Sequence, residues 1–202
     1  MRASVYLRSV LGVRMRFVCS SAAIAILALC CAPLSAYAQP ADIWTRSILD
    51  EVRLGVLAHD IEPNGNEGGV DFNIELLFKR PTTVYRTSLE NVLLRPRFHL
   101  GSSLNFGSDT NQVYAGLTWD VPLAPKLSLE VSFGGVLHDG PTGSEPNSLG
   151  CALNFRESLS IGYQLSDRWR VYGTVTHISN ADLCDQNSGL TSAGVRFGYT
   201  LN

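Results

Sequence analysis

His177 and Ser179 are the residues of this 202-residue chain whose types and spacing best suit chemistry. They lie two positions apart, so in an extended strand they share one face, with Cβ atoms about 7 Å apart. An imidazole can reach a hydroxyl over that distance and remove its proton, which is the minimum that a serine nucleophile requires. The pair therefore indicates nucleophilic catalysis, a chemistry that needs no metal and no cofactor.

The segment that carries this pair alternates between apolar and polar residues with a period of two. The positions that share a face with His177 and Ser179 are apolar or small: Trp169, Val171, Gly173 and Val175. Polar groups that continue such a stripe lose their water and need a specific reason. The alternative is that the strand has reached the headgroup zone of a membrane, where polar residues are ordinary.

A carboxylate interrupts the apolar face of the preceding segment. Glu157 falls between Phe155 and Leu159 on that face, where a charge is costly if the face meets lipid. The short connection 165–168 allows two pairing registers, with Glu157 either diagonal to His177 or directly opposite it. Both registers put the carboxylate near the imidazole.

Alternation with a period of two recurs along the chain. We count eight such segments: 50–59, 70–79, 92–102, 111–121, 127–138, 151–163, 168–179 and 190–201. Gly-, Asn- and Pro-rich loops alternate with shorter connections, although 80–91 is longer than a tight turn. This pattern predicts an all-β fold, an eight-stranded antiparallel transmembrane β-barrel.

The sense of the alternation separates a membrane barrel from a soluble one. Small and polar residues fill the interior of a small barrel, so the apolar sets should face lipid. A soluble barrel of the lipocalin kind would alternate in the opposite sense. Arginines that mostly take inward or rim positions should form ion pairs in the interior with Glu75, Glu130 and Asp71; they are Arg95, Arg97, Arg156, Arg170 and Arg196.

Residues 1–38 have the pattern of a cleaved signal peptide. Arginines precede the apolar run Ala22–Cys31, and Ala36-Tyr37-Ala38 resembles a cleavage site, with translation starting at Met1 or Met15. We therefore expect residues 39–202 to form a single barrel domain in the bacterial outer membrane. Cys151 and Cys184 are the two cysteines left in that domain, and an exported protein favours their pairing as a disulfide.

The charges exclude some classes of partner. The whole chain has a formal net charge of −2, and it contains no basic cluster of the kind that binds nucleic acid. His59, His99 and His138 show no repeated ligand spacing, so we expect no metal site.

The run His177-Ile178-Ser179-Asn180-Ala181, followed by Asn187-Ser188-Gly189, resembles the signature of the outer-membrane lipid A 3-O-deacylases (PagL), which are acyloxyacyl hydrolase-like enzymes. The resemblance implies a barrel whose lipid-facing side carries a His/Ser/Glu triad and removes the acyl chain ester-linked at position 3 of lipid A. It implies that His177 is the general base, Ser179 the nucleophile and Asn180 an oxyanion or support residue. The expected partners are lipopolysaccharide and other outer-membrane lipids, and a homodimer stays open.

One residue departs from the family pattern. The family's glutamate follows its histidine by fourteen positions, where this chain has Thr191. Glu157 is the candidate to supply the acid instead; Asp182 and Asp185 are weaker candidates. Alternatively, the dyad works more slowly without an acid, or the chain is an inactive, lipid-binding or structural relative. A phospholipase is a further alternative, because the chemistry at Ser179 would be identical.

Overall fold

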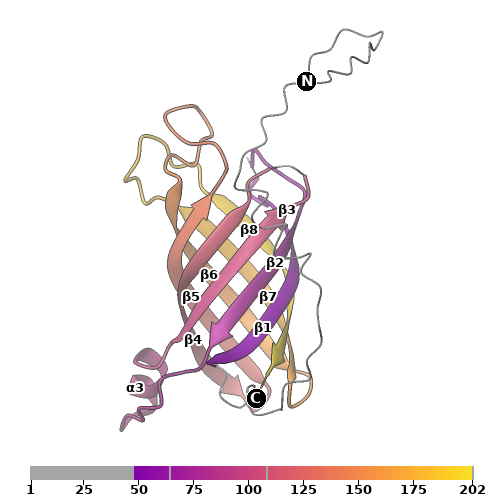
Figure 1. Cartoon of the computed structure of the whole chain (residues 1–202), viewed down its shortest axis with the longest axis vertical. Helices are drawn as coiled ribbons and strands as arrows, with labels where there is room; N and C mark the ends of the chain where they lie inside the picture. The colour runs from indigo at the N-terminus through magenta and orange to yellow at the C-terminus, as the bar shows by residue number, and fades with distance from the viewer. Residues whose placement is uncertain (1–47, 64, 108, 202) are drawn as a thin grey trace, which may run out of the picture. The chain divides into compact units, whose positions relative to one another are not determined.

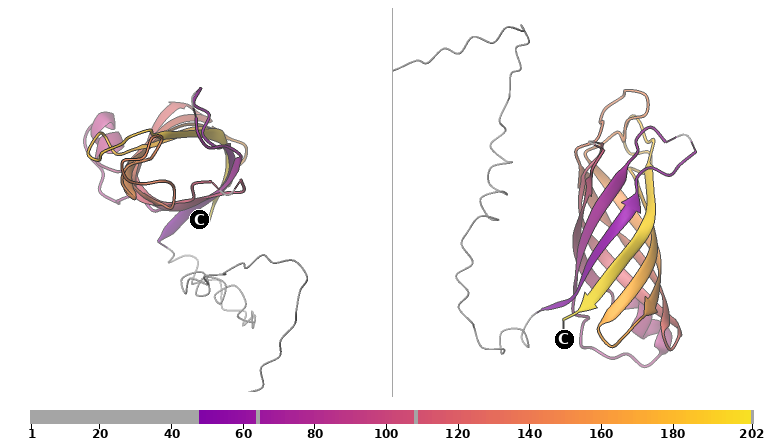
Figure 2. Two further views of the ribbon diagram at one scale, coloured as in Figure 1. Left: turned by 90° about the horizontal axis from the view of Figure 1, so that it is seen from above. Right: turned by 90° about the vertical axis from the view of Figure 1, so that its right-hand side faces the viewer.

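The chain folds into one closed antiparallel β-barrel in the computed structural model, which describes residues 48–63, 65–107 and 109–201. Neighbouring strands follow one another in chain order, and β8 pairs with β1 to close the ring (Figures 1 and 2). The strands are β1 (Leu49–Ala58), β2 (Val70–Phe78), β3 (Arg97–Asn105), β4 (Gln112–Ala124), β5 (Leu127–His138), β6 (Leu153–Gln164), β7 (Trp169–Ser179) and β8 (Leu190–Thr200). The predicted eight-stranded fold is confirmed, whereas the predicted signal peptide lies outside the described residues.

The connection between β2 and β3 differs from the prediction. A short helix, α3 (Ser88–Leu93), occupies it, so the strand predicted at 92–102 begins only at Arg97. Thr87 and Glu90 form a capping box, in which each side chain accepts a hydrogen bond from the other residue's backbone N–H. The helix lies at the end of the barrel opposite the long loops (Figure 1). Among the described residues, no helical segment meets the length and hydropathy that a membrane-spanning helix needs.

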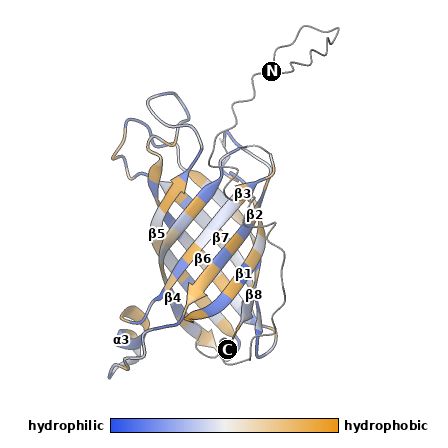
Figure 3. Ribbon diagram, in the orientation of Figure 1, coloured by the Kyte–Doolittle hydropathy of each residue, from blue (hydrophilic) through white to orange (hydrophobic). Residues whose placement is uncertain are grey.

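Side chains alternate between the outer wall and the interior along each strand, as the period of two requires. On β1, Leu54 and Val56 are 46% and 55% exposed, whereas Arg53 is 1% exposed. The inward residues Asp71, Asn73 and Glu75 of β2 are likewise buried. Figure 3 shows the resulting alternation of hydrophobic and hydrophilic positions along the strands. This sense of alternation is the one predicted for a barrel in lipid.

A network of ion pairs crosses the interior of the barrel. The Arg53 guanidinium donates hydrogen bonds to Glu51 at 2.9 Å, Glu75 at 3.3 Å and Glu130 at 2.7 Å. It also lies over the Tyr172 ring, 4.0 Å from the centroid. Because these partners come from β1, β2, β5 and β7, the network ties β5 and β7 to β1 and β2, with which they share no backbone pairing.

The other inward arginines extend this network. Arg97 pairs with Glu51, Asp120 and Glu130, and Arg196 pairs with Glu75 at 2.9 Å. Arg156 instead lies over the ring of Tyr114, 3.7 Å from its centroid. The ion pairs expected for Arg97 and Arg196 are therefore present, and these charged side chains help to fill the interior of the barrel.

Replacing Arg53 by alanine should destabilise the barrel by about 3–5 kcal/mol, because the buried Glu51 and Glu130 carboxylates would lose a partner. Urea unfolding of the protein in lipid vesicles measures this change. Arg168→Ala is the control: its guanidinium is exposed and donates to the Tyr199 hydroxyl, so its removal should change the stability far less than Arg53→Ala does. Equal stabilities for the two variants would contradict the importance of the interior network.

Candidate active site

The ends of β6, β7 and β8 nearest the long loops bring the residues singled out by the sequence to one patch of the outer wall. Ile178, the residue between His177 and Ser179, is buried inside at 1% exposure, so the pair faces outward. His177 pairs with Glu157 of β6 on one side and with Thr191 of β8 on the other. Among the described residues no hydrogen bond joins His177 to Ser179; such bonds commonly tighten only when substrate is bound.

The imidazole of His177 turns toward β8. Its Nδ1 lies 2.8 Å from the hydroxyl oxygen of Thr191 and 3.6 Å from a carboxylate oxygen of Glu62. The Thr191 hydroxyl in turn donates to Glu62 at 2.5 Å. Glu62 lies in the loop that joins β1 to β2, and sequence reasoning missed it because only the pairing of β1 with β8 brings this loop to Thr191.

Gly189 leaves space for the imidazole ring of His177. A Cβ atom at this position would lie 2.9 Å from Cε1 and 3.5 Å from Nε2 of His177, and the backbone has a positive φ of 69°. Both features favour glycine. The Nε2 side of the ring therefore borders a residue without a side chain.

Glu157 lies directly opposite His177, which is one of the two registers allowed by the sequence. One of its carboxylate oxygens, Oε2, is buried and has no hydrogen-bond partner among the described residues. No ion pair joins it to His177 in the part of the chain that the structure describes. The carboxylate is therefore adjacent to the histidine, whereas Nδ1 contacts Thr191 and Glu62.

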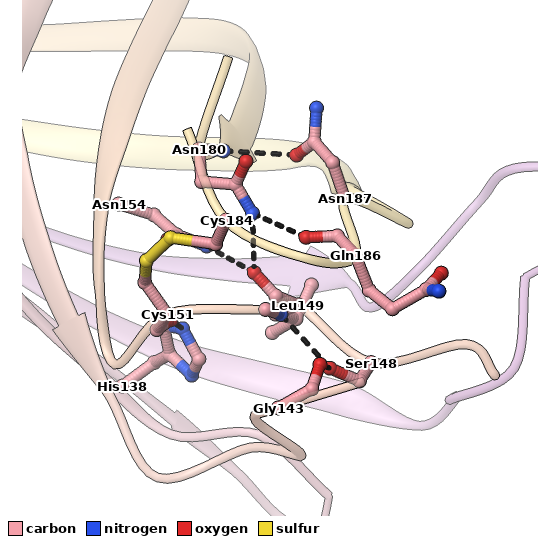
Figure 4. Close-up of a disulfide and its surroundings, with 11 residues drawn as sticks. His138, Gly143, Ser148, Leu149, Cys151, Asn154, Asn180, Cys184, Gln186 and Asn187 are labelled. Carbon is pink, nitrogen blue, oxygen red and sulfur yellow. Dashed lines mark hydrogen bonds between the residues drawn. A yellow bond between two sulfur atoms is a disulfide. The ribbon is translucent and has the colours of Figure 1, made fainter. Parts of the chain in front are cut away.

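Asn180 is buried, and its side chain connects two loops (Figure 4). Its side-chain amide donates to the carbonyls of Leu149 at 2.9 Å and Gln186 at 2.5 Å, and its backbone N–H donates to Asn187 Oδ1 at 2.9 Å. Because an amide NH₂ group has two hydrogens, both of its side-chain donors are engaged. This geometry favours support of the loops over contact with a reacting oxyanion.

A disulfide joins the same two loops, as predicted. Cys151 and Cys184 are linked, with Cα atoms 6.0 Å apart, beside Asn180 (Figure 4). Gly150 makes this close approach possible, because a Cβ there would overlap the Gln186 carbonyl and lie 2.5 Å from Asn180 Nδ2. The loop that follows Ser179 is thus fixed by a covalent bond and by hydrogen bonds.

The loop that carries Glu62 has its own ionic anchor. The ring nitrogens of His59 lie 2.8 Å from Asp71 and 2.9 Å from Glu67. Burial opposes protonation of His59, but hydrogen bonds to the two carboxylates outweigh it and raise the pKa to about 9. Burial likewise opposes ionisation of Glu67, but hydrogen bonds from His59 and Thr110 prevail and lower its pKa.

Two apolar grooves lie on the outer wall near this patch: His177 lines the first, and Phe155, the strand partner of Ser179, lines the second. The first has a volume of about 480 Å³ and is lined by residues that include Val131, Leu159, Val175 and His177. The second, of about 400 Å³, lies nearer the loops and is lined by residues that include Gly135, Phe155 and Leu183. Phe133 borders both grooves, and it stacks against Phe155 with centroids 5.8 Å apart. The site therefore adjoins surfaces that suit hydrocarbon chains.

The other predicted histidines lie away from this patch. His99 contacts Thr118 inside the barrel, and His138 contacts the Cys151 carbonyl. No group of three or more His, Cys, Asp or Glu side chains suited to a metal ion occurs within the described residues.

His59 should titrate near pH 9 rather than near its usual 6.5, because its imidazolium holds two carboxylates. A raised folded-state pKa means that the stabilisation is fully present below pH 6.5 and is lost as the pH rises through about 9. NMR titration of the His59 ring in micelles, assigned with His59→Gln, measures the midpoint. A midpoint near 6.5 would contradict the anchoring of this loop by charge.

Comparison with known proteins agrees with this architecture. The model of the lipid A 3-O-deacylase (PagL) family matches residues 66–200. The crystal structure of the outer-membrane enzyme PagL is similar, with a TM-score of 0.55 and 16% identity, over 74% of this chain and 98% of that one. Neisserial surface protein A also shares the fold, with a TM-score of 0.51 and 9% identity, over 76% of this chain and 97% of that one. No curated protein matches the sequence significantly.

The family match covers most of the described barrel and includes His177, Ser179 and Thr191. The structural matches, at this low identity, support the barrel fold itself. On this evidence the chain is an outer-membrane β-barrel that belongs to the lipid A 3-O-deacylase (PagL) family.

Proposed function

We propose that this chain is an active serine esterase that hydrolyses the acyl chain ester-linked at the 3-O position of lipid A in the outer leaflet. Ser179 is the nucleophile and His177 is the general base. The observation that carries this proposal is the position of the pair: both residues face outward from β7 beside two apolar grooves. A site on the lipid-facing wall suits a substrate that never leaves the membrane.

The grooves support an acyl substrate in particular. An acyl chain lying along Val131, Leu159 and Val175 would contact mostly apolar surface, with Glu157 and His177 also lining the groove. The loop-rich end of the barrel would then face the sugar headgroup of the same lipid. This arrangement brings an ester, which joins chain to headgroup, to the level of His177 and Ser179.

The proposed reaction follows from the hydrogen bonds of His177. Because Nδ1 contacts the Thr191 hydroxyl, Nε2 is the nitrogen that receives the proton of Ser179. The Ser179 oxygen attacks the ester carbonyl, and the sugar hydroxyl leaves with the proton returned by His177. Water activated by the same histidine then releases the fatty acid and regenerates Ser179.

Asn180 serves this reaction as a support residue. Its three N–H groups are engaged by Leu149, Gln186 and Asn187, so it holds the loop that follows the nucleophile. The disulfide Cys151–Cys184 acts on the same loop. Together they keep Ser179 at a fixed place at the end of β7.

Expression of the protein in a host with 3-O-acylated lipid A should remove one hydroxyacyl chain from that lipid, and Ser179→Ala should abolish the change. Loss of the nucleophile typically lowers kcat by several orders of magnitude. Mass spectrometry of extracted lipid A measures the loss of the chain. Heat-dependent migration on gels controls for folding of both proteins.

Two other outcomes would contradict the proposal. An unchanged lipid A spectrum with a folded wild-type barrel would favour a lipid-binding or structural relative. Release of fatty acid from glycerophospholipids in the same membranes, with lipid A intact, would favour a phospholipase.

A further inference from the structure

We infer that Glu62 is a positioning residue for His177, acting through the hydroxyl of Thr191. This inference rests on the proposed function of His177 as a general base. It assigns the missing acid to a loop that follows β1. Glu62 precedes residues 66–200, the region matched by the family model, so the family match itself does not point to it.

The three side chains form one continuous hydrogen-bonded chain. Thr191 Oγ1 lies 2.5 Å from Glu62 Oε1 and 2.8 Å from His177 Nδ1. Glu62 Oε1 is also only 3.6 Å from Nδ1, within the range of a direct ion pair. The carboxylate therefore acts on the ring both through the hydroxyl and through its charge.

The direction of these hydrogen bonds fixes the state of the imidazole. An ionised carboxylate can only accept, so the single hydroxyl proton of Thr191 goes to Glu62. The hydroxyl oxygen must then accept from His177, which places the ring proton on Nδ1. Nε2 is left unprotonated, and this is the state that a general base needs before it takes a proton from a serine.

The backbone holds Glu62 at this place. The preceding residue, Ile61, donates its N–H to the Thr191 carbonyl at 2.8 Å, and Gly65 donates its N–H to the Glu62 carbonyl at 2.9 Å. The Asp60 carboxylate accepts the N–H groups of Asn66 at 2.8 Å and Glu67 at 3.1 Å. Glu62 is thus fixed on both sides by the loop's own hydrogen bonds, in addition to the His59 anchor.

Glu157 is the rival source of the acid. It lies across from His177 on the β6 side, but Nδ1 faces the β8 side, and no hydrogen bond joins the two residues among those described. A carboxylate that positions the ring must contact Nδ1 if Nε2 is to serve Ser179. Glu62 and Thr191 meet this requirement, so Glu157→Gln provides the matched control for Glu62→Gln.

The first experiment determines which nitrogen of the His177 ring carries the proton, and it does not depend on enzyme activity. Nitrogen-15 NMR of labelled histidines in micelles, at a pH where the rings are neutral, should show His177 protonated at Nδ1. The signal is assigned with His177→Gln. In Glu62→Gln and in Thr191→Val the ring should shift toward the Nε2-protonated form that free histidine prefers, whereas Glu157→Gln should leave it unchanged. An unchanged His177 tautomer in all three variants would overturn the inference.

The second experiment measures deacylation of 3-O-acylated lipid A in mixed micelles. Glu62→Gln and Thr191→Val should lower kcat by about 10- to 100-fold with little change in KM, because the change affects the base rather than the lipid contacts. The double variant Glu62→Gln with Thr191→Glu should recover activity, since residue 191 pairs directly with His177 and a carboxylate there can reach Nδ1.

The outcomes separate this inference from the proposed function. If the wild-type protein and Ser179→Ala are equally inactive, the proposed function fails and the NMR result alone decides the role of Glu62. If the wild-type protein is active but Glu62→Gln matches it, Glu62 has no positioning role. If kcat falls 10- to 100-fold in Glu157→Gln and does not fall in Glu62→Gln, the positioning acid is Glu157 on β6 instead.

Discussion

The alternation of side chains across a closed barrel wall is the constraint on which the other features of this structure depend. Closure pairs every strand on both sides, so each residue must face either the interior or the lipid. The interior accepts Arg53, Glu51 and Glu130 because their charges neutralise one another there. The same alternation puts His177 and Ser179 on the lipid side, since the residue between them is buried inside.

The site lies where this rigid wall meets the loops, and each of its parts is held by a different loop contact. Asn180 and the disulfide fix the chain after Ser179. The anchor of His59 with Asp71 and Glu67 fixes the loop that carries Glu62. A polar group on a lipid-facing wall costs free energy. These contacts fix the polar side chains of the site in position. Beyond Glu157 and Thr191, which flank His177, the strand neighbours of the pair on this wall are mostly apolar, such as Phe155, Leu159 and Val175.

The sequence predicted the barrel well because a period of two is a local signal. The eight strands follow from it, and so does the outward direction of His177 and Ser179; the disulfide was predicted separately, from the two cysteines left in an exported domain. The helix α3 was missed because six residues are too few to show a helical period. The register between β6 and β7 was narrowed to two choices, and the structure adopts the one that places Glu157 opposite His177.

Glu62 could not be predicted, because its relation to Thr191 spans 129 positions and exists only once β1 and β8 close the barrel. Thr191, which as a residue type cannot replace a carboxylate, acquires a carboxylate neighbour only in the folded chain. The engagement of every Asn180 N–H group is equally a product of loop packing, whereas its residue type alone suited an oxyanion site.

We propose that Ser179 is an activated nucleophile on the outer wall of the barrel. Incubation of the folded protein in micelles with a long-chain alkyl fluorophosphonate, followed by peptide mass spectrometry, tests it directly. We expect a covalent phosphonyl adduct on Ser179, formed with loss of fluoride, and strongly reduced labelling in His177→Ala. A folded wild-type barrel that remains unlabelled at Ser179 would contradict it.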